Sequence, residues 1–212
     1  MIKLVFFGDS ICYGQFIPPN KIWMNRLSET LTAVVPEIYI QNSSVSGNTT
    51  RMALERMPHD VQAHGADVFY VQFGMNDCNY WATDNGMPRV SAAAFEANLH
   101  EILARGRRFG AKTLLLATNH PTPKTERYTY ADISYQESNS AYNAIIRKVA
   151  QAEKTILVDH ESYWFRHMKG SGVRDYVLED GVHLNLEGHG LYYAHLEPIL
   201  LQAVEFPSRK SA

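Results

Sequence analysis

The feature that most constrains the fold of this chain is a regular alternation between short apolar runs and longer segments with helical periodicity. The short runs show no in–out alternation, as in Thr113–Ala117. Continuous apolar runs of this length are typical of parallel strands that are covered on both faces. We therefore predict five strands, at Ile2–Phe7, Glu37–Asn42, Val68–Phe73, Lys112–Thr118 and Thr155–Asp159.

The segments between these strands carry a helical pattern. Ser91 and Asn185 are suitable N-caps, and Gly110 follows the third helical segment, where glycine readily ends a helix. The helices are expected at Lys21–Val34, Thr49–Gln62 with an interruption near Pro58, Ala92–Phe109, Tyr135–Glu153 and Asn185 to about Ala203. Strands that alternate with helices predict a doubly wound α/β fold around a five-stranded parallel sheet.

The composition fits an ordinary globular domain. The length of 212 residues suits one domain, residues 1–212, and 45% hydrophobic residues suffice for a core. A net charge of −2 with scattered cations does not predict a nucleic-acid partner. No apolar run is long enough to span a membrane. The first apolar run ends before Gly8 with no cleavage signal, so a cytoplasmic location is expected.

Two cysteines, Cys12 and Cys78, are too few for a disulfide framework. They follow Ser10 and Asn76 by two positions each, so they lie close to candidate site residues in the sequence. Unpaired cysteine commonly behaves as a small hydrophobic residue. We predict two buried thiols.

Four short motifs stand where a doubly wound sheet binds its ligands, in loops beyond the carboxyl ends of strands. Each motif alone is weak, because Gly, Asn, Asp and Ser are also the ordinary residues of turns and caps. Their occurrence together and in order is the stronger signal. The motifs are Gly8-Asp9-Ser10, Ser46-Gly47-Asn48-Thr49, Gly74-Met75-Asn76-Asp77 and Asp180-Gly181-Val182-His183.

Together these motifs resemble the conserved blocks of the SGNH hydrolases, also called GDSL esterases and lipases. The resemblance spans residues 8–183, and its one departure is Ile11, where the family motif has Leu. The family's four letters correspond to Ser10, Gly47, Asn76 and His183. The resemblance implies a flavodoxin-like, three-layer α/β/α fold and hydrolysis of esters.

The chemistry of these side chains agrees with that implication. A serine hydroxyl needs a base to become a nucleophile, and a histidine imidazole accepts and returns a proton near neutral pH. We therefore predict Ser10 as nucleophile, His183 as base and Asp180 as the carboxylate that orients the imidazole. The backbone N–H groups of Ser10 and Gly47 and the amide of Asn76 are the expected oxyanion donors.

Other polar residues near the motifs receive more modest predictions. Asp9 and Asp77 are expected to hold loops through backbone hydrogen bonds. Asn79, Tyr80, Trp81 and His120 are candidates for substrate binding, because they follow predicted strands at the same edge of the sheet. The remaining histidines considered are expected on helices or on the surface: His59, His64, His100, His167, His189 and His195.

The sequence predicts a serine esterase that cleaves short acyl esters, especially acetyl esters, on a carbohydrate or another small molecule. No cofactor and no metal is expected, and the motifs of zinc proteases, P-loops and dinucleotide sites do not occur. The Gly-Xaa-Ser-Xaa-Gly elbow of α/β-hydrolases is also missing, since Cys12 replaces its second glycine. Two alternatives stay open, an O-acyltransferase with the same acyl-enzyme and a non-catalytic carbohydrate-binding domain.

Overall fold

The computed structural model describes residues 1–170 and 172–208, and it is built on one parallel sheet. The strand order is β2-β1-β3-β4-β5, and every pairing is parallel. The predicted fold class is confirmed, and each strand lies within one residue of its predicted bounds. The strands are β1 Ile2–Gly8, β2 Ile38–Asn42, β3 Val68–Gln72, β4 Thr113–Ala117 and β5 Ile156–Val158.

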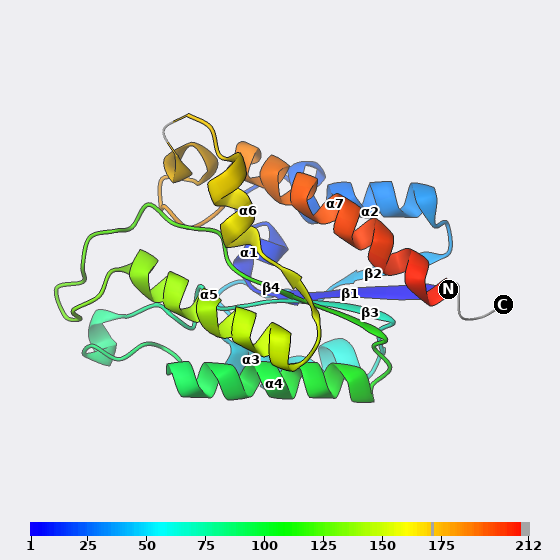
Figure 1. The fold of residues 1–212 in the computed structure, drawn as a ribbon, viewed down its shortest axis with the longest axis horizontal. Helices are drawn as coiled ribbons and strands as arrows, with labels where there is room; N and C mark the ends of the chain where they lie inside the picture. Colours follow the sequence, from blue (N-terminus) through cyan, green and yellow to red (C-terminus); the bar gives the residue numbers. More distant parts are fainter. Residues whose placement is uncertain (171, 209–212) are drawn as a thin grey trace.

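Helices cover both faces of this sheet, with α2, α6 and α7 on one side and α3, α4 and α5 on the other (Figure 1). Helix α1 is a single turn directly after β1. The bounds are α1 Ser10–Tyr13, α2 Trp23–Val34, α3 Thr50–Met57, α4 Ala92–Arg108, α5 Tyr135–Ala152, α6 His160–His167 and α7 Leu186–Ser208. Shorter helical turns are Pro19–Lys21, Pro58–Gln62, Ala82–Asp84 and Val173–Tyr176.

The predicted helix ends are largely confirmed by their caps. Ser91 accepts a hydrogen bond from the N–H of Ala94, and Asn185 Oδ1 accepts one from the N–H of Gly188. The interruption predicted near Pro58 is also confirmed, since α3 ends at Met57 and a separate π-helical turn begins at Pro58, because proline cannot donate the hydrogen bond that would continue α3. One feature differs from the expectation. Helix α6 was not predicted, since eight residues give too little periodicity to detect.

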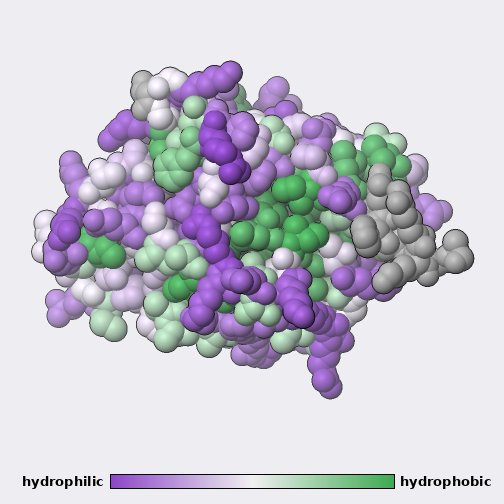
Figure 2. All heavy atoms as spheres, in the orientation of Figure 1, coloured by the Kyte–Doolittle hydropathy of each residue, from purple (hydrophilic) through white to green (hydrophobic). Residues whose placement is uncertain are grey.

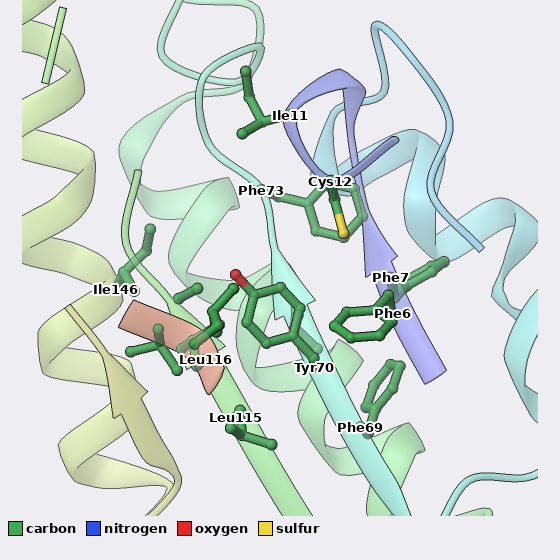
Figure 3. Close-up of a cluster of buried hydrophobic side chains, with 14 of the residues drawn as sticks. Phe6, Phe7, Ile11, Cys12, Phe69, Tyr70, Phe73, Leu115, Leu116 and Ile146 are labelled. Atoms are coloured by element: carbon green, nitrogen blue, oxygen red, sulfur yellow. The ribbon is translucent and has the colours of Figure 1, made fainter. Parts of the chain in front are cut away.

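The core consists of side chains that point from both faces of the sheet (Figure 3). Phe6 packs edge-on against Trp23 of α2, with ring centroids 5.6 Å apart. Its neighbour Phe7 points to the other face, where it meets Phe73 at 5.2 Å. Successive residues of β1 are therefore buried under different helical layers, which explains why the strand is continuously apolar from Leu4 to Phe7 rather than alternating.

The surface seen in Figure 2 is mostly hydrophilic, with a hydrophobic area between the positions of α5 and α7. A depression of about 760 Å³ is lined there by residues such as Leu114, Ile156 and Ile199. It lies at the start of β4 and β5, at the opposite edge of the sheet from the loops that carry the four motifs. No helix among the described residues has the length and hydropathy needed to cross a membrane.

Helix α7 is fastened to α2 by a buried histidine. The N–H of Trp23 donates to Nδ1 of His189 at 3.1 Å, and the His189 side chain is 1% exposed. Burial lowers the pKa of His189 to about 4, helped by the nearby charge of Arg26. The imidazole must be neutral to accept this hydrogen bond, so its protonation opposes folding.

The pH dependence of stability follows from this shift. The folded pKa lies below the unfolded value of about 6.5, so the contribution of His189 is complete above pH 6.5 and is lost as the pH falls toward 4. We predict that His189→Gln, which keeps an acceptor but cannot titrate, reduces the loss of unfolding free energy between pH 7 and pH 5 by about 2 kcal/mol. Urea unfolding at the two pH values measures this. Equal pH dependence of wild type and variant would contradict it.

Candidate active site

Ser10 is placed at the carboxyl edge of the sheet by the junction of β1 and α1. Asp9 caps α1, since its Oδ1 accepts the N–H of Ile11 at 3.0 Å, and this turn makes Ser10 the first helical residue. Gly8 permits the sharp turn, because a Cβ there would lie 2.7 Å from Cβ of Cys12. Ser10 is 7% exposed and is therefore largely buried.

His183 meets Ser10 from a tight loop at the far end of the sequence. Val177 and Leu184 form an isolated β-bridge, and the N–H of Leu178 donates to the carbonyl of His183 at 2.7 Å. The loop thus presents the imidazole to the sheet edge, where Nε2 lies 2.9 Å from Oγ of Ser10. The second ring nitrogen, Nδ1, lies 2.6 Å from Oδ2 of Asp180.

Asp180 is well suited to remain charged beside this imidazole. Its Oδ1 accepts the N–H groups of Val182 at 2.8 Å and His183 at 2.9 Å. Partial burial acts to raise the pKa of Asp180, but the hydrogen bonds from the His183 ring and these two backbone groups outweigh it and lower the pKa. The carboxylate therefore holds the proton on Nδ1 and leaves Nε2 free to accept one from Ser10.

The expected oxyanion residues lie beside this pair. The amide Nδ2 of Asn76 is 3.1 Å from the carbonyl of Asn48, which follows Gly47, and 3.4 Å from Oδ2 of Asp9, which precedes Ser10. Gly47 has φ +78, a left-handed conformation that glycine adopts without strain. The structure therefore brings all three predicted donors to one place, although their role in the reaction stays a prediction.

Asp9 and Asp77 hold loops, as predicted. Besides capping α1, Asp9 is completely buried, and burial raises its pKa to about 7. Oδ1 of Asp77 accepts the N–H of Thr50 at 2.9 Å and its hydroxyl at 2.5 Å, which ties β3 to the start of α3. Burial raises the pKa of Asp77 to about 6 despite these bonds. Both carboxyl groups thus stabilise the backbone around the site through hydrogen bonds.

The substrate contact expected for His120 is corrected by its surroundings. His120 is completely buried and stacks on Trp164, with ring centroids 4.8 Å apart. Its Nδ1 bonds to the hydroxyl of Tyr192 and its Nε2 to the carbonyl of Val182, both at 2.9 Å. Burial lowers the pKa of His120 to about 3, so the ring is neutral. It faces inward and supports the residue next to His183.

Asn79, Tyr80 and Trp81 line a groove of about 720 Å³ that also reaches Asp180 and Val182. The opposite wall comes from the loop after β4, which contributes Tyr128 and Tyr130. Tyr128 packs against Tyr80 and Tyr130, with ring centroids 5.6 and 5.3 Å apart, and its hydroxyl donates to Oδ1 of Asn79 at 2.9 Å. The two loops therefore form one aromatic surface in a groove that extends to Asp180.

Two further residues at the site were missed by the sequence analysis. Phe16 is exposed, and its ring lies edge-on to the imidazole of His183 at 5.1 Å. Its φ of +71 is unusual for a residue with a large side chain. This backbone conformation could not be recognised from the sequence. Arg89 contacts the carbonyl of Gly47 and the side chain of Asn76. Only its place in the loop after β3 could have drawn attention to it.

The cysteines and remaining histidines behave as expected. Cys12 and Cys78 are free and buried, and burial raises the pKa of each thiol, that of Cys12 to about 12. The six other histidines named from the sequence lie on helices or at the surface. Within the described residues, no group of three or more His, Cys, Asp or Glu side chains is placed to hold a metal ion.

The fold has three layers, and its parallel sheet carries Ser, His and Asp in contact at the carboxyl edge. This combination defines the class of SGNH-type ester hydrolases. Residues 6–191 match the model of the GDSL-like Lipase/Acylhydrolase family. The chain belongs to this family and is an esterase of the SGNH/GDSL kind.

Known proteins similar to this chain include two bacterial esterases. An arylesterase of Vibrio mimicus is 24% identical over 181 residues, covering 85% of this chain and 79% of its own. Esterase TesA of Pseudomonas aeruginosa is 27% identical over 180 residues, covering 85% and 78%.

Solved structures show the same fold. A variant of Axe2, an acetyl-xylooligosaccharide esterase from Geobacillus stearothermophilus, superimposes with a TM-score of 0.76 at 22% identity over 92% of both chains. The acetyl xylan esterase AlAXEase gives a TM-score of 0.75 at 23% identity over 92% of this chain and 98% of its own. At these identities the likeness shows the architecture alone.

The contacts of Asp180 predict an order of effects on turnover. We expect Asp180→Ala to lower kcat less than His183→Ala, because the imidazole that carries the proton remains when the carboxylate is removed. Steady-state hydrolysis of p-nitrophenyl acetate by both purified variants measures this. Equal losses would mean that the imidazole has no useful orientation without Asp180.

Proposed function

We propose that this enzyme hydrolyses short-chain carboxylic esters through an acyl-enzyme on Ser10, with His183 as the base and Asp180 as its orienting carboxylate. The observation that carries the proposal is the unbroken contact from Ser10 Oγ to His183 Nε2 at 2.9 Å and from His183 Nδ1 to Asp180 Oδ2 at 2.6 Å. The first distance suits proton transfer from Ser10 to His183 without rearrangement, and the second suits a hydrogen bond that orients the imidazole.

In the proposed reaction, Oγ of Ser10 attacks the ester carbonyl carbon while its proton moves to Nε2 of His183. The carbonyl oxygen becomes an oxyanion, which the N–H groups of Ser10 and Gly47 and the Nδ2 of Asn76 stabilise. The bond to the alcohol oxygen then breaks, and His183 returns the proton to that oxygen. Water then attacks the acyl carbon while His183 takes one of its protons; the acyl-serine bond breaks, His183 passes that proton to Oγ of Ser10, and the acid is released.

The groove beside Asp180 favours a carbohydrate as the alcohol portion of the ester. Its walls combine tyrosine and tryptophan rings with charged side chains such as Lys124 and Arg127. Such a surface offers apolar faces for a sugar ring together with donors and acceptors for its hydroxyl groups. The names of the acetyl xylan esterases that share the fold support the same substrate class.

The nucleophile is tested with a panel of p-nitrophenyl acetate, butyrate and octanoate. We predict that kcat/KM is highest for acetate and that Ser10→Ala lowers kcat by about 10⁴-fold or more. Ser28→Ala is the matched control, since this serine donates only to the carbonyl and sulfur of Met24 within α2. Equally low rates of wild type and Ser10→Ala would favour a non-catalytic binding domain.

The groove is tested with an acetylated xylobiose. We predict that Tyr128→Ala raises KM for this sugar about three- to tenfold while KM for p-nitrophenyl acetate stays unchanged, because only the sugar is long enough to reach Tyr128. Tyr128→Phe keeps the ring and should retain most of the affinity. A Tyr128→Ala variant with wild-type KM for the sugar would place the alcohol portion elsewhere.

Addition of a free sugar acceptor, with analysis of the products, separates hydrolysis from acyl transfer.

A further inference from the structure

Arg89 connects the loop after β3 to two of the expected oxyanion residues. Its Nη1 donates to the carbonyl of Gly47 at 3.3 Å and to Oδ1 of Asn76 at 3.4 Å. The side chain is half-buried. These contacts join loops that follow β2 and β3, and the reaction proposed above assigns Arg89 no role.

The contact with Asn76 matters because a side-chain amide has two chemically opposite ends. Only the NH₂ end can stabilise an oxyanion, whereas the oxygen would repel it. A guanidinium has donors and no acceptor and keeps its charge at all ordinary pH values. It can therefore bind only Oδ1, which leaves Nδ2 on the side of Asn48 and Asp9, next to Ser10.

The positive charge also strengthens Nδ2 as a donor. A cation at the amide oxygen draws electron density along the O–C–N group, which makes the N–H bonds more polar. Hydrogen bonds that involve a charged group are stronger than neutral ones. A cation held here would therefore act on an oxyanion through Asn76, and its bond to the Gly47 carbonyl would restrain the backbone of Gly47.

The guanidinium is itself held in place. It lies over the ring of Trp81, 4.2 Å from the centroid. The backbone N–H of Arg89 donates to the carbonyl of Asn79 at 2.9 Å, and that of Val90 donates to the carbonyl of Asp77 at 3.1 Å. A side chain with this support loses little freedom when the substrate binds, which is what a preorganised site requires.

We propose that Arg89 is a positioning residue of the oxyanion hole, acting through Asn76 and Gly47. The inference rests on the function proposed for Ser10, His183 and Asn76. A different role would be direct binding of an anionic group of the substrate, because Arg89 and Arg51 line a depression of about 370 Å³ beside Trp81. The two roles affect different kinetic constants, so one set of variants distinguishes them.

The experiment compares Arg89→Ala, Arg89→Gln and Arg89→Lys with wild type on p-nitrophenyl acetate. We expect Arg89→Ala to lower kcat about ten- to hundredfold with KM changed less than twofold, and Arg89→Lys to restore part of the loss. Arg51→Ala is the matched control, since it removes an exposed arginine from the same depression without a contact to Asn76 or Gly47. Circular dichroism verifies folding, and Arg89→Gln and Arg89→Lys provide the test if Arg89→Ala does not fold.

A double-mutant cycle supplies the decisive readout. If Arg89 acts through Asn76, Arg89→Ala should cost less than about twofold in kcat when Asn76 is already alanine. Fully additive losses, an unchanged kcat in Arg89→Ala, or an effect confined to KM for esters of acidic alcohols would each overturn the inference. Failure of the proposed function looks different, because Ser10→Ala would then be as active as wild type.

Discussion

The hydrogen bond between Ser10 and His183 is the contact on which the rest of this structure depends, since it joins residues that are 173 positions apart. A hydroxyl and an imidazole so distant in the sequence meet only if both are held by rigid elements, because a loose pair would seldom be within transfer distance. Ser10 is held by a capped helical turn at the end of β1, which lies between β2 and β3 in the sheet. His183 stands on a loop, and its support comes from three sides.

The support of the His183 loop combines local and distant contacts. Asp180 closes the loop through two backbone N–H groups, and the bridge between Val177 and Leu184 closes its base. From the interior, Gln72 of β3 donates to the hydroxyl of Tyr192 at 2.9 Å. That hydroxyl donates to His120, whose other ring nitrogen donates to the carbonyl of Val182. The hydrogen bonds of this buried chain all run in one direction and connect β3, in the middle of the sheet, to the residue before His183.

Sequence reasoning located the four motifs because each depends on local information. An apolar run that ends in Gly-Asp-Ser, or an Asp three residues before a His, can be read without knowledge of the rest of the chain. The order of the strands along the sheet then brings the motifs to one edge. The same local information could not show that His120 turns inward, because its partner Tyr192 lies 72 residues away and belongs to α7.

Arg89 and Tyr128 escaped detection for a related reason. Each occupies a long polar loop without periodicity, where the direction of a side chain depends on partners from another loop. Arg89 meets Gly47 across 42 residues, and Tyr128 meets Asn79 across 49. No pattern within either loop indicates such a pairing. The parts of the site that carry chemistry were therefore predictable, whereas the parts that orient the chemistry and shape the groove required the fold.

The two aspartates nearest to the reacting groups show how surroundings set the charge. Asp180 receives hydrogen bonds from the His183 ring and two backbone groups, and its pKa is lowered, so it is a carboxylate at neutral pH. Asp9 is completely buried, and burial outweighs its bonds from Ile11 and Asn76 and raises its pKa to about 7. The negative charge is thereby favoured behind the imidazole, where it stabilises the imidazolium. Beside Asn76 the neutral form of the Asp9 carboxyl is more populated, and a negative charge at that position would oppose the developing oxyanion. The opposite pKa shifts of Asp180 and Asp9 thus distinguish the proposed acid–base side of the site from its proposed oxyanion side.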